Sequence, residues 1–123
     1  MRFLNMDHKI KFTDLIKRDK VQIFDVERQA VFYILSANEE LCNKIQSIYN
    51  FEKHDIEPDI LNKISLSPVA SKMLQMGYSL LNGTCKTYND VNYLFSDFDI
   101  QPFEVCVYAL RIFFGNIEVE LKG

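Results

Sequence analysis

The most apolar run of the chain lies in its first third. Residues 30–35 (AVFYIL) carry one hydroxyl and no charge, and they follow good helix formers that begin after Asp25. Asp25 is a suitable N-cap, because its carboxylate can accept a hydrogen bond from a backbone N–H of the first turn. A buried strand also suits these residues, but the preceding residues favour a helix over residues 26–36. Having almost no polar face, this helix is expected at the centre of the protein.

The next stretch has an amphipathic helical pattern that reaches Asn50. Ser36 and Glu39 fit a capping box, in which each side chain satisfies a free backbone N–H of the other residue. The apolar positions that follow share one helical face: Leu41, Cys42, Ile45, Ile48 and Tyr49. Residues 25–51 are therefore predicted to form a helical hairpin with a very short turn, whose two helices are neighbours.

The remaining segments are predicted to cover this hairpin. A first helix is expected over residues 6–18, with an apolar stripe among lysines. Residues 51–66 are the least regular part, with one helical turn. Ser67 and Pro68 predict the start of a long helix, since serine is a good N-cap and proline suits the first helical position. Gly77 inside that helix costs about 1 kcal/mol relative to alanine, and we expect the close approach of a neighbouring helix as its reason.

Two further helices and a tail complete the chain. A short helix is expected to start at residues 87–90 and a last helix at Pro102, with Gly115 as its end. The apolar face of the last helix is expected to consist of Phe103, Cys106, Val107, Leu110, Phe113 and Phe114. Alternation over residues 117–121 predicts a short strand or an extended tail. The predicted fold class is all-α: a single compact domain over residues 1–123, with five to six helices around the central helical hairpin.

Composition and charge change this picture little. The chain has 123 residues, 48% hydrophobic, with a formal net charge of −3, which is typical of an ordinary globular domain. An acidic balance disfavours nucleic-acid binding, because that affinity comes mostly from Lys and Arg at phosphates. The local exception is a basic group interrupted by aspartates: Lys9, Lys11, Lys17, Arg18 and Lys20, with Asp7, Asp14 and Asp19. We interpret it as a solvated helix face, and keep weak nucleic-acid binding through this first helix as a second alternative.

The cysteines indicate a reducing compartment. Cys42, Cys85 and Cys106 are odd in number, and no pair has a metal-like spacing. Cys42 and Cys106 fall on helix faces that we expect to be buried, where a thiol acts as a small hydrophobe. The chain shows no targeting segment and no apolar run of about 20 residues, the length that spans a bilayer. We therefore expect a cytoplasmic protein without membrane contact.

The sequence contains no legible catalytic or metal site. His8 and His54 are the only histidines, and each sits beside an aspartate, Asp7 and Asp55. A metal site needs three or four ligands at organised spacing, and a phosphate-binding loop needs a glycine pattern that is missing. We expect surface or capping histidines, no cofactor and no enzymatic activity.

Arg28 is the charged residue of most interest, because it borders the most apolar helix. A charge so near a core is usually paired, so we favour an internal cluster with Asn38, Asn5 or His8. The alternative function is a small-ligand-binding protein or a minor enzyme, with a pocket near Asn5, His8, Arg28 and Tyr33. The candidate ligand- or partner-binding residues are Asn5, His8, Arg28, Tyr33, Asn38, His54 and Asp55.

Several short motifs in the first half of the chain are shared with a known kind of protein. They are Phe3-Leu4-Asn5 with His8, Glu27-Arg28 with Ala30, Phe32-Tyr33-Ile34-Leu35, and Ile48-Tyr49-Asn50-Phe51. The chain resembles a family of small uncharacterised helical proteins from Firmicutes and their phages and mobile elements. The resemblance covers about the first sixty residues and weakens after Pro58. It implies a compact helical domain and carries no catalytic residue.

The function expected from these observations is protein binding. We expect a non-enzymatic regulatory or interaction module, such as a phage- or mobile-element-encoded modulator of a host protein. The candidate contact segments are the loop over residues 52–59 and the C-terminal tail. If Ile117, Val119 and Leu121 point outward, the tail can pair edge to edge with a second copy, which predicts a homodimer.

Overall fold

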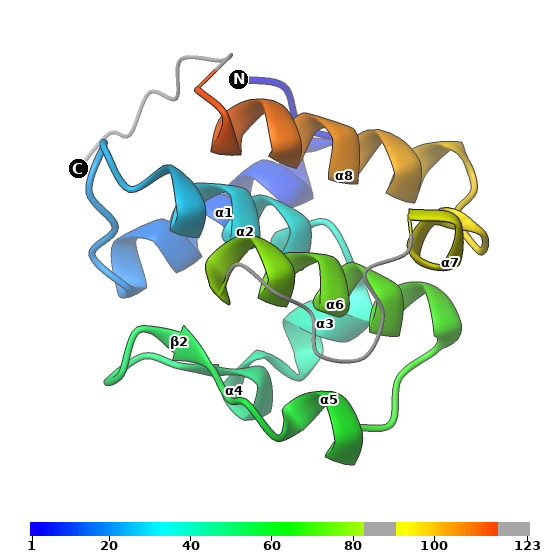
Figure 1. The fold of residues 1–123 in the computed structure, drawn as a ribbon. Helices are drawn as coiled ribbons and strands as arrows, with labels where there is room; N and C mark the ends of the chain where they lie inside the picture. The colour runs from blue at the N-terminus through cyan, green and yellow to red at the C-terminus, as the bar shows by residue number, and fades with distance from the viewer. Residues whose placement is uncertain (83–90, 116–123) are drawn as a thin grey trace.

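The central element of the fold is helix α2 (Val26–Ser36), as the computed structural model shows for residues 1–82 and 91–115 (Figure 1). The side chains of residues 30–35 are all buried, and none is more than 3% exposed. The Asp25 carboxylate accepts a hydrogen bond from Arg28 N at 3.2 Å, as expected of an N-cap. Burying such side chains contributes about 1.5–3 kcal/mol each, so α2 organises the packing of its neighbours.

Three long helices cover α2. Helix α1 (Met6–Arg18) crosses behind it, and α6 (Pro68–Asn82) and α8 (Ile100–Phe113) flank it on the viewer's side (Figure 1). Helices α2 and α8 run antiparallel and share one of the two most extensive helix contacts, the other being α2 with α6. The predictions of an all-α fold and of a central helix over residues 26–36 are confirmed.

Helix α1 has the predicted ends. Asn5 accepts a hydrogen bond from His8 N at 2.8 Å, and the helix ends at the C-cap residue Asp19. Beyond it, Lys20 adopts a left-handed conformation (φ 54°). Val21 N then donates to Ile16 O at 3.0 Å, which is the hydrogen bond of a Schellman ending.

The second half of the predicted hairpin is not one helix. It is divided into α3 (Glu39–Asn43), α4 (Ile45–Ile48) and a strand β1 (Tyr49–Asn50). The predicted Ser36–Glu39 capping box is wrong, because Asn38 caps α3 by accepting from Leu41 N at 2.9 Å. The Ser36 hydroxyl instead donates to Tyr33 O within its own helix.

A small β-hairpin replaces the predicted helix end. Strand β1 pairs antiparallel with β2 (Asp55–Ile56), and Tyr49 lies opposite Ile56. Both of these side chains are buried at 0–1% exposure, and aromatic and β-branched residues suit a paired strand. Asn50 Oδ1 accepts hydrogen bonds from the backbone of residues 52 and 53. This side-chain turn competes with helix continuation.

The later helices follow the predictions in part. A single turn, α5 (Ile60–Lys63), precedes α6, and Ser67 Oγ accepts from Ala70 N at 3.2 Å as the predicted N-cap. Helix α7 spans Val91–Phe95, and its predicted start at residues 87–90 lies outside the described residues. Helix α8 begins at Ile100, two residues before Pro102. Proline is tolerated there because the first four N–H groups of a helix have no intrahelical partner.

The predicted apolar face of α8 is rotated from the observed one. The buried residues are Val105, Cys106, Ala109 and Ile112, of which only Cys106 was predicted. Phe103 is 47% exposed and Phe114 is 69% exposed. Small and branched side chains let α8 lie close to α2, and Phe103 packs instead against Phe95 of α7, with ring centroids 5.4 Å apart. Gly115 ends the helix in a left-handed conformation (φ 74°), and the predicted strand or tail over residues 117–121 lies outside the described part.

Gly77 is predicted to tolerate alanine. Its Cα faces α2, but a Cβ placed there would lie 3.7 Å from Val31 Cγ1, an ordinary van der Waals distance. We expect Gly77→Ala to raise the free energy of unfolding by about 0.5–1 kcal/mol, because alanine is the better helix former. Urea unfolding measures this difference.

The contrasting variant is Gly115→Ala. Gly115 has the left-handed backbone conformation, so alanine there should lower the free energy of unfolding by about 1 kcal/mol. A loss of stability in Gly77→Ala would show that α2 and α6 approach too closely for a methyl group.

Candidate functional site

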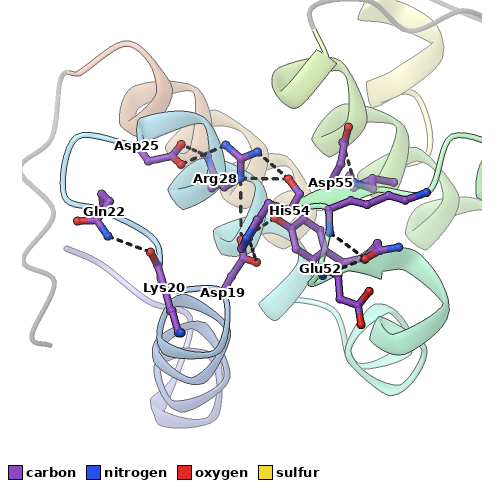
Figure 2. A network of polar contacts seen from close by, with 12 residues as sticks. Asp19, Lys20, Gln22, Asp25, Arg28, Glu52, His54 and Asp55 are labelled. Carbon is purple, nitrogen blue, oxygen red and sulfur yellow. Dashed lines mark hydrogen bonds and ion pairs between the residues drawn. The ribbon is translucent and has the colours of Figure 1, made fainter.

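A polar cluster centred on Asp19 joins three elements of the fold (Figure 2). We call it the Asp19 cluster, and its members are Asp19, Asp25, Arg28, Tyr49 and His54. The Asp19 carboxylate is fully buried and lies 2.7 Å from His54 Nδ1. Its other oxygen accepts a hydrogen bond from the Tyr49 hydroxyl at 2.6 Å. The cluster therefore ties the end of α1 to the start of α2 and to the β-hairpin.

Arg28 holds the backbone of the hairpin loop. Its Nη2 and Nε donate to His54 O at 2.6 and 3.2 Å, and its Nη1 donates to Asp25 at 3.1 Å. The Arg28 guanidinium also lies 3.9 Å from the Asp19 carboxylate. Because Asp25 is both the N-cap of α2 and a partner of Arg28, the position of this guanidinium follows from the local fold of the helix start.

His54 has a strained backbone, and its Nε2 has no hydrogen-bond partner among the described residues. Its φ of 56° lies in the left-handed region, which costs about 1–2 kcal/mol for a residue with a Cβ. Nδ1 donates to Asp19, and the side chain is 49% exposed. A carboxylate that orients an imidazole in this way can serve proton transfer. Within the described chain, however, no hydroxyl or thiol is bonded to Nε2, so the cluster lacks a nucleophile.

Electrostatics explains why these groups gather. A buried carboxylate is stable only when it is paired and hydrogen-bonded, and His54, Tyr49 and Arg28 supply those partners to Asp19. Burial, together with the hydrogen bond to Asp19, raises the pKa of Tyr49 above its usual range. Tyr49 therefore stays protonated and remains a donor to the carboxylate.

Sequence reasoning found Arg28 and His54 but missed the residue that joins them. Asp19 was interpreted as part of a solvated face, and that interpretation is wrong because the residue is only 3% exposed. A signal was present, since a carboxylate at a helix C-terminus is unfavourable to the helix dipole and so implies another partner. The partners predicted for Arg28, namely Asn5, His8 and Asn38, are also wrong.

Asn38 and Asp55 have local structural roles. Asn38 caps α3, and its Nδ2 lies 3.8 Å from Met73 Sδ. The His54 ring pairs with Asp19 and not with the neighbouring Asp55, whose carboxylate accepts a hydrogen bond from Ile56 N at 2.7 Å. Neither residue is brought into a common site with the other candidates.

His8 and Tyr33 fix the N-terminal segment onto α2. Leu4 N donates to His8 Nδ1 at 3.1 Å, so the ring proton is on Nε2, which donates to Tyr33 O at 3.0 Å. The Tyr33 hydroxyl donates to Arg2 O at 2.7 Å. His8 is 2% exposed and Tyr33 is 3% exposed. Both side chains are thus buried and satisfied by the backbone.

A surface pocket lies next to this contact, between the N-terminal segment and α8. Its volume is about 180 Å³, and its lining consists of Arg2, Phe3, Leu4, Tyr33, Glu104, Val105, Val107, Tyr108 and Arg111. Of the four residues predicted to surround one pocket, only Tyr33 is part of it. Asn5 caps α1, His8 is buried, and Arg28 belongs to the Asp19 cluster. Sequence reasoning missed the α8 side of this pocket, because its polar residues are not adjacent in sequence to the N-terminal ones.

The described thiols are not activated. Cys106 is buried, and burial raises its pKa to about 12. Cys42 is half-buried, its thiol lies 3.3 Å from Leu35 O, and burial raises its pKa as well. A reactive cysteine needs the opposite shift. Cys85 lies outside the described residues.

Residues 1–82 and 91–115 contain neither a metal-binding group of side chains nor a membrane-spanning helix. No three side chains of His, Cys, Asp or Glu there are grouped closely enough to hold a metal ion. No helix in those ranges is both long and apolar enough to cross a lipid bilayer.

Comparison with protein families gives one match. A family described as "Family of unknown function (DUF6075)" matches residues 1–122. The chain belongs to this family. This match continues past Pro58, where the resemblance described above weakens, and it covers nearly the whole sequence. No curated protein and no solved structure matches the chain.

The Asp19 cluster is predicted to be a main source of stability. We expect Asp19→Asn to lower the free energy of unfolding by about 1–3 kcal/mol, because an amide has one acceptor oxygen where the carboxylate has two, so either the Tyr49 hydroxyl or His54 Nδ1–H loses its acceptor. Urea unfolding monitored by circular dichroism measures this loss. The matched control is Asp14→Asn, at an exposed position of the same helix, where we expect a change within about 0.5 kcal/mol. Equal effects of the two substitutions would contradict a structural role of the cluster.

His8 is predicted to make stability depend on pH. Burial lowers the pKa of His8 below the 6.5 of a free histidine, although the hydrogen bond to Tyr33 O and the charge of Asp7 oppose this shift. The unfolded chain therefore binds the proton more readily, and protonation favours unfolding. The His8 contribution is complete above about pH 6.5 and is lost as the pH falls through the folded pKa.

The variant that tests this is His8→Gln. We expect it to be less stable than the wild type at about pH 8, and the gap to narrow at about pH 5, since glutamine does not titrate. Urea unfolding of both proteins across this range measures the gap. Because all other titrating groups are shared, parallel stability profiles would show that His8 is not held neutral.

Proposed function

We propose that this protein is a non-enzymatic interaction module that works by binding protein, with an apolar surface at one end of the fold as its contact region. We call this surface the apolar end, and its residues are Ile23, Phe24 and Phe114. They are 67%, 79% and 69% exposed, respectively. This exposure of three large apolar side chains is the observation that carries the proposal.

The three residues belong to segments at the same end of the α2–α8 pair. Ile23 and Phe24 directly precede α2, and Phe114 directly follows α8. Since the two helices are antiparallel neighbours, the start of α2 and the end of α8 lie at the same end of the molecule (Figure 1). Single exposed apolar side chains are common, but a group of them at one place is typical of a protein-binding surface.

The occupant we propose for the apolar end is a second copy of this chain. A stable interface buries about 800 Å² on each partner, and three large side chains supply only part of that area. The remainder would come from residues 117–121, whose alternating Ile117, Val119 and Leu121 follow Phe114 by a few positions. A twofold dimer uses the same patch on both subunits. The apolar end of one subunit can therefore pack against the apolar end of the other.

The geometry gives less support to the two alternatives. A ligand pocket around Asn5, His8, Arg28 and Tyr33 is disfavoured, because Arg28 belongs to the Asp19 cluster, and the His8 and Tyr33 side chains are buried and hydrogen-bonded to the backbone. Nucleic-acid binding through α1 is weakened because two of its cations are engaged: Lys11 pairs with Asp7 at 2.9 Å and Arg18 lies 4.0 Å above the Phe51 ring. The outer face of α1 also exposes Met6 and Ile10, which do not bind phosphates.

The cellular setting that we propose is the cytoplasm. The thiols of Cys42 and Cys106 are free, which suits a reducing compartment. The resemblance to proteins of Firmicutes and their mobile elements favours a host protein as the further partner, with the dimer as the form that binds it.

The test of the dimer is a paired substitution at the apolar end. We expect the wild-type protein to sediment as a dimer that dissociates on dilution, and the double variant Phe24→Ser, Phe114→Ser to be monomeric with unchanged circular dichroism. Analytical ultracentrifugation measures both. The control is Met6→Ser, which removes an exposed apolar side chain from α1 and should leave the dimer intact. A wild-type protein that is monomeric at every accessible concentration would overturn the proposal.

A further inference from the structure

We propose that the pocket between the N-terminal segment and α8 binds a small carboxylate attached to a planar apolar group such as an aromatic ring. We call it the Tyr108 pocket. None of the predicted functions uses this pocket except through Tyr33. The inference is independent of the proposed dimer.

The first observation is a donor without a partner at the pocket wall. The Tyr108 hydroxyl oxygen accepts a hydrogen bond from Arg2 N at 2.7 Å. The neighbouring Tyr33 hydroxyl uses its proton on Arg2 O, also at 2.7 Å. No acceptor for the Tyr108 O–H proton is found among the described residues, so this proton can be donated to a ligand in the pocket.

The second observation is an unpaired guanidinium on the same helix face. Arg111 lies one turn after Tyr108, so the two side chains are neighbours on α8. In the described part of the chain, Arg111 makes no ion pair and no hydrogen bond through its side chain. A guanidinium binds a carboxylate through two parallel N–H donors. Arg111 and the Tyr108 hydroxyl therefore form a three-donor arrangement that suits a carboxylate.

The charge balance of the lining favours an anion. Two arginines, Arg2 and Arg111, and one acid, Glu104, line the pocket. Glu104 is seven residues before Arg111, which places it about 10 Å away along the helix axis, given a rise of 1.5 Å per residue. The acid therefore lies one turn before Tyr108 along α8, on the side away from Arg111.

The apolar walls and the volume define the rest of the ligand. The Tyr33 and Tyr108 rings stack at 5.0 Å with an interplanar angle of 25°, and Phe3 lies 5.8 Å from Tyr33. Aromatic walls favour planar ligands, because offset and edge-to-face ring contacts are attractive. The volume of about 180 Å³ is below the range of about 300–1,000 Å³ for drug-sized ligands. A single ring with one carboxylate therefore matches the space.

Benzoate is the probe for this inference. We expect benzoate to bind the full chain and to shift the amide resonances of the N-terminal segment and of α8 in two-dimensional NMR spectra. Benzamide has the same ring without the charge and should bind at least about tenfold more weakly, because hydrogen bonds to a charged acceptor are stronger than those to a neutral one. Equal binding of the two compounds, or no binding of benzoate, would overturn the inference.

Substitutions in α8 test which side chains donate hydrogen bonds to the carboxylate. Arg111→Gln and Tyr108→Phe should each weaken benzoate binding by about tenfold or more, whereas Lys17→Gln, an exposed cation at the far end of α1, should not change it. Arg111 is exposed, so its variant is expected to fold, and circular dichroism checks the Tyr108 variant. If Arg111→Gln binds benzoate as the wild type does, the proposed carboxylate site is wrong.

Discussion

The structure depends on the burial of α2 on all sides. A helix without a polar face must be covered everywhere by other elements, and α1, α6 and α8 supply that cover. The buried polar side chains of α2, those of Gln29, Tyr33 and Ser36, are therefore bound by backbone groups. Gln29 is 1% exposed, and its amide donates to the carbonyls of Gln22 and Ile23 at 2.9 and 2.8 Å. This buried amide shapes the connection that carries the apolar end, so the core and the proposed contact surface are physically linked.

The Asp19 cluster illustrates how local strain is stabilised by charge. The left-handed conformation of His54 costs about 1–2 kcal/mol, whereas each hydrogen bond to a charged group contributes about 1.5–3 kcal/mol. The His54 carbonyl accepts such bonds from Arg28, and the His54 ring donates one to the Asp19 carboxylate. The strain is therefore more than offset. A structural role accounts for every contact of the cluster.

Structural features that depend on neighbouring residues were predicted correctly from the sequence. Contacts between residues far apart in the sequence were not. The N-caps Asn5, Asp25 and Ser67 act within their own first turns, so a pattern of a few residues suffices to find them. The partner of Arg28 could not be found in this way, because Asp19 and His54 are 35 residues apart and meet only through the β-hairpin. Likewise, the pocket residues Arg2 and Tyr108 are separated by 106 positions.

Helix α8 shows why periodicity can place a helix correctly and orient it wrongly. Two sets of apolar residues fit its pattern, the large aromatic one and the smaller Val105, Ala109 and Ile112. Close packing against the fully apolar α2 selects the smaller set, since interiors are filled to crystal-like density. The large side chains of Phe103 and Phe114 are then directed to the surface, whereas Leu110 and Phe113 pack against the edge of the core. Tyr108, Arg111 and Phe114 therefore lie outside the core as a consequence of how α2 is buried, and the two surfaces to which we assign binding both include residues from this outward side of α8.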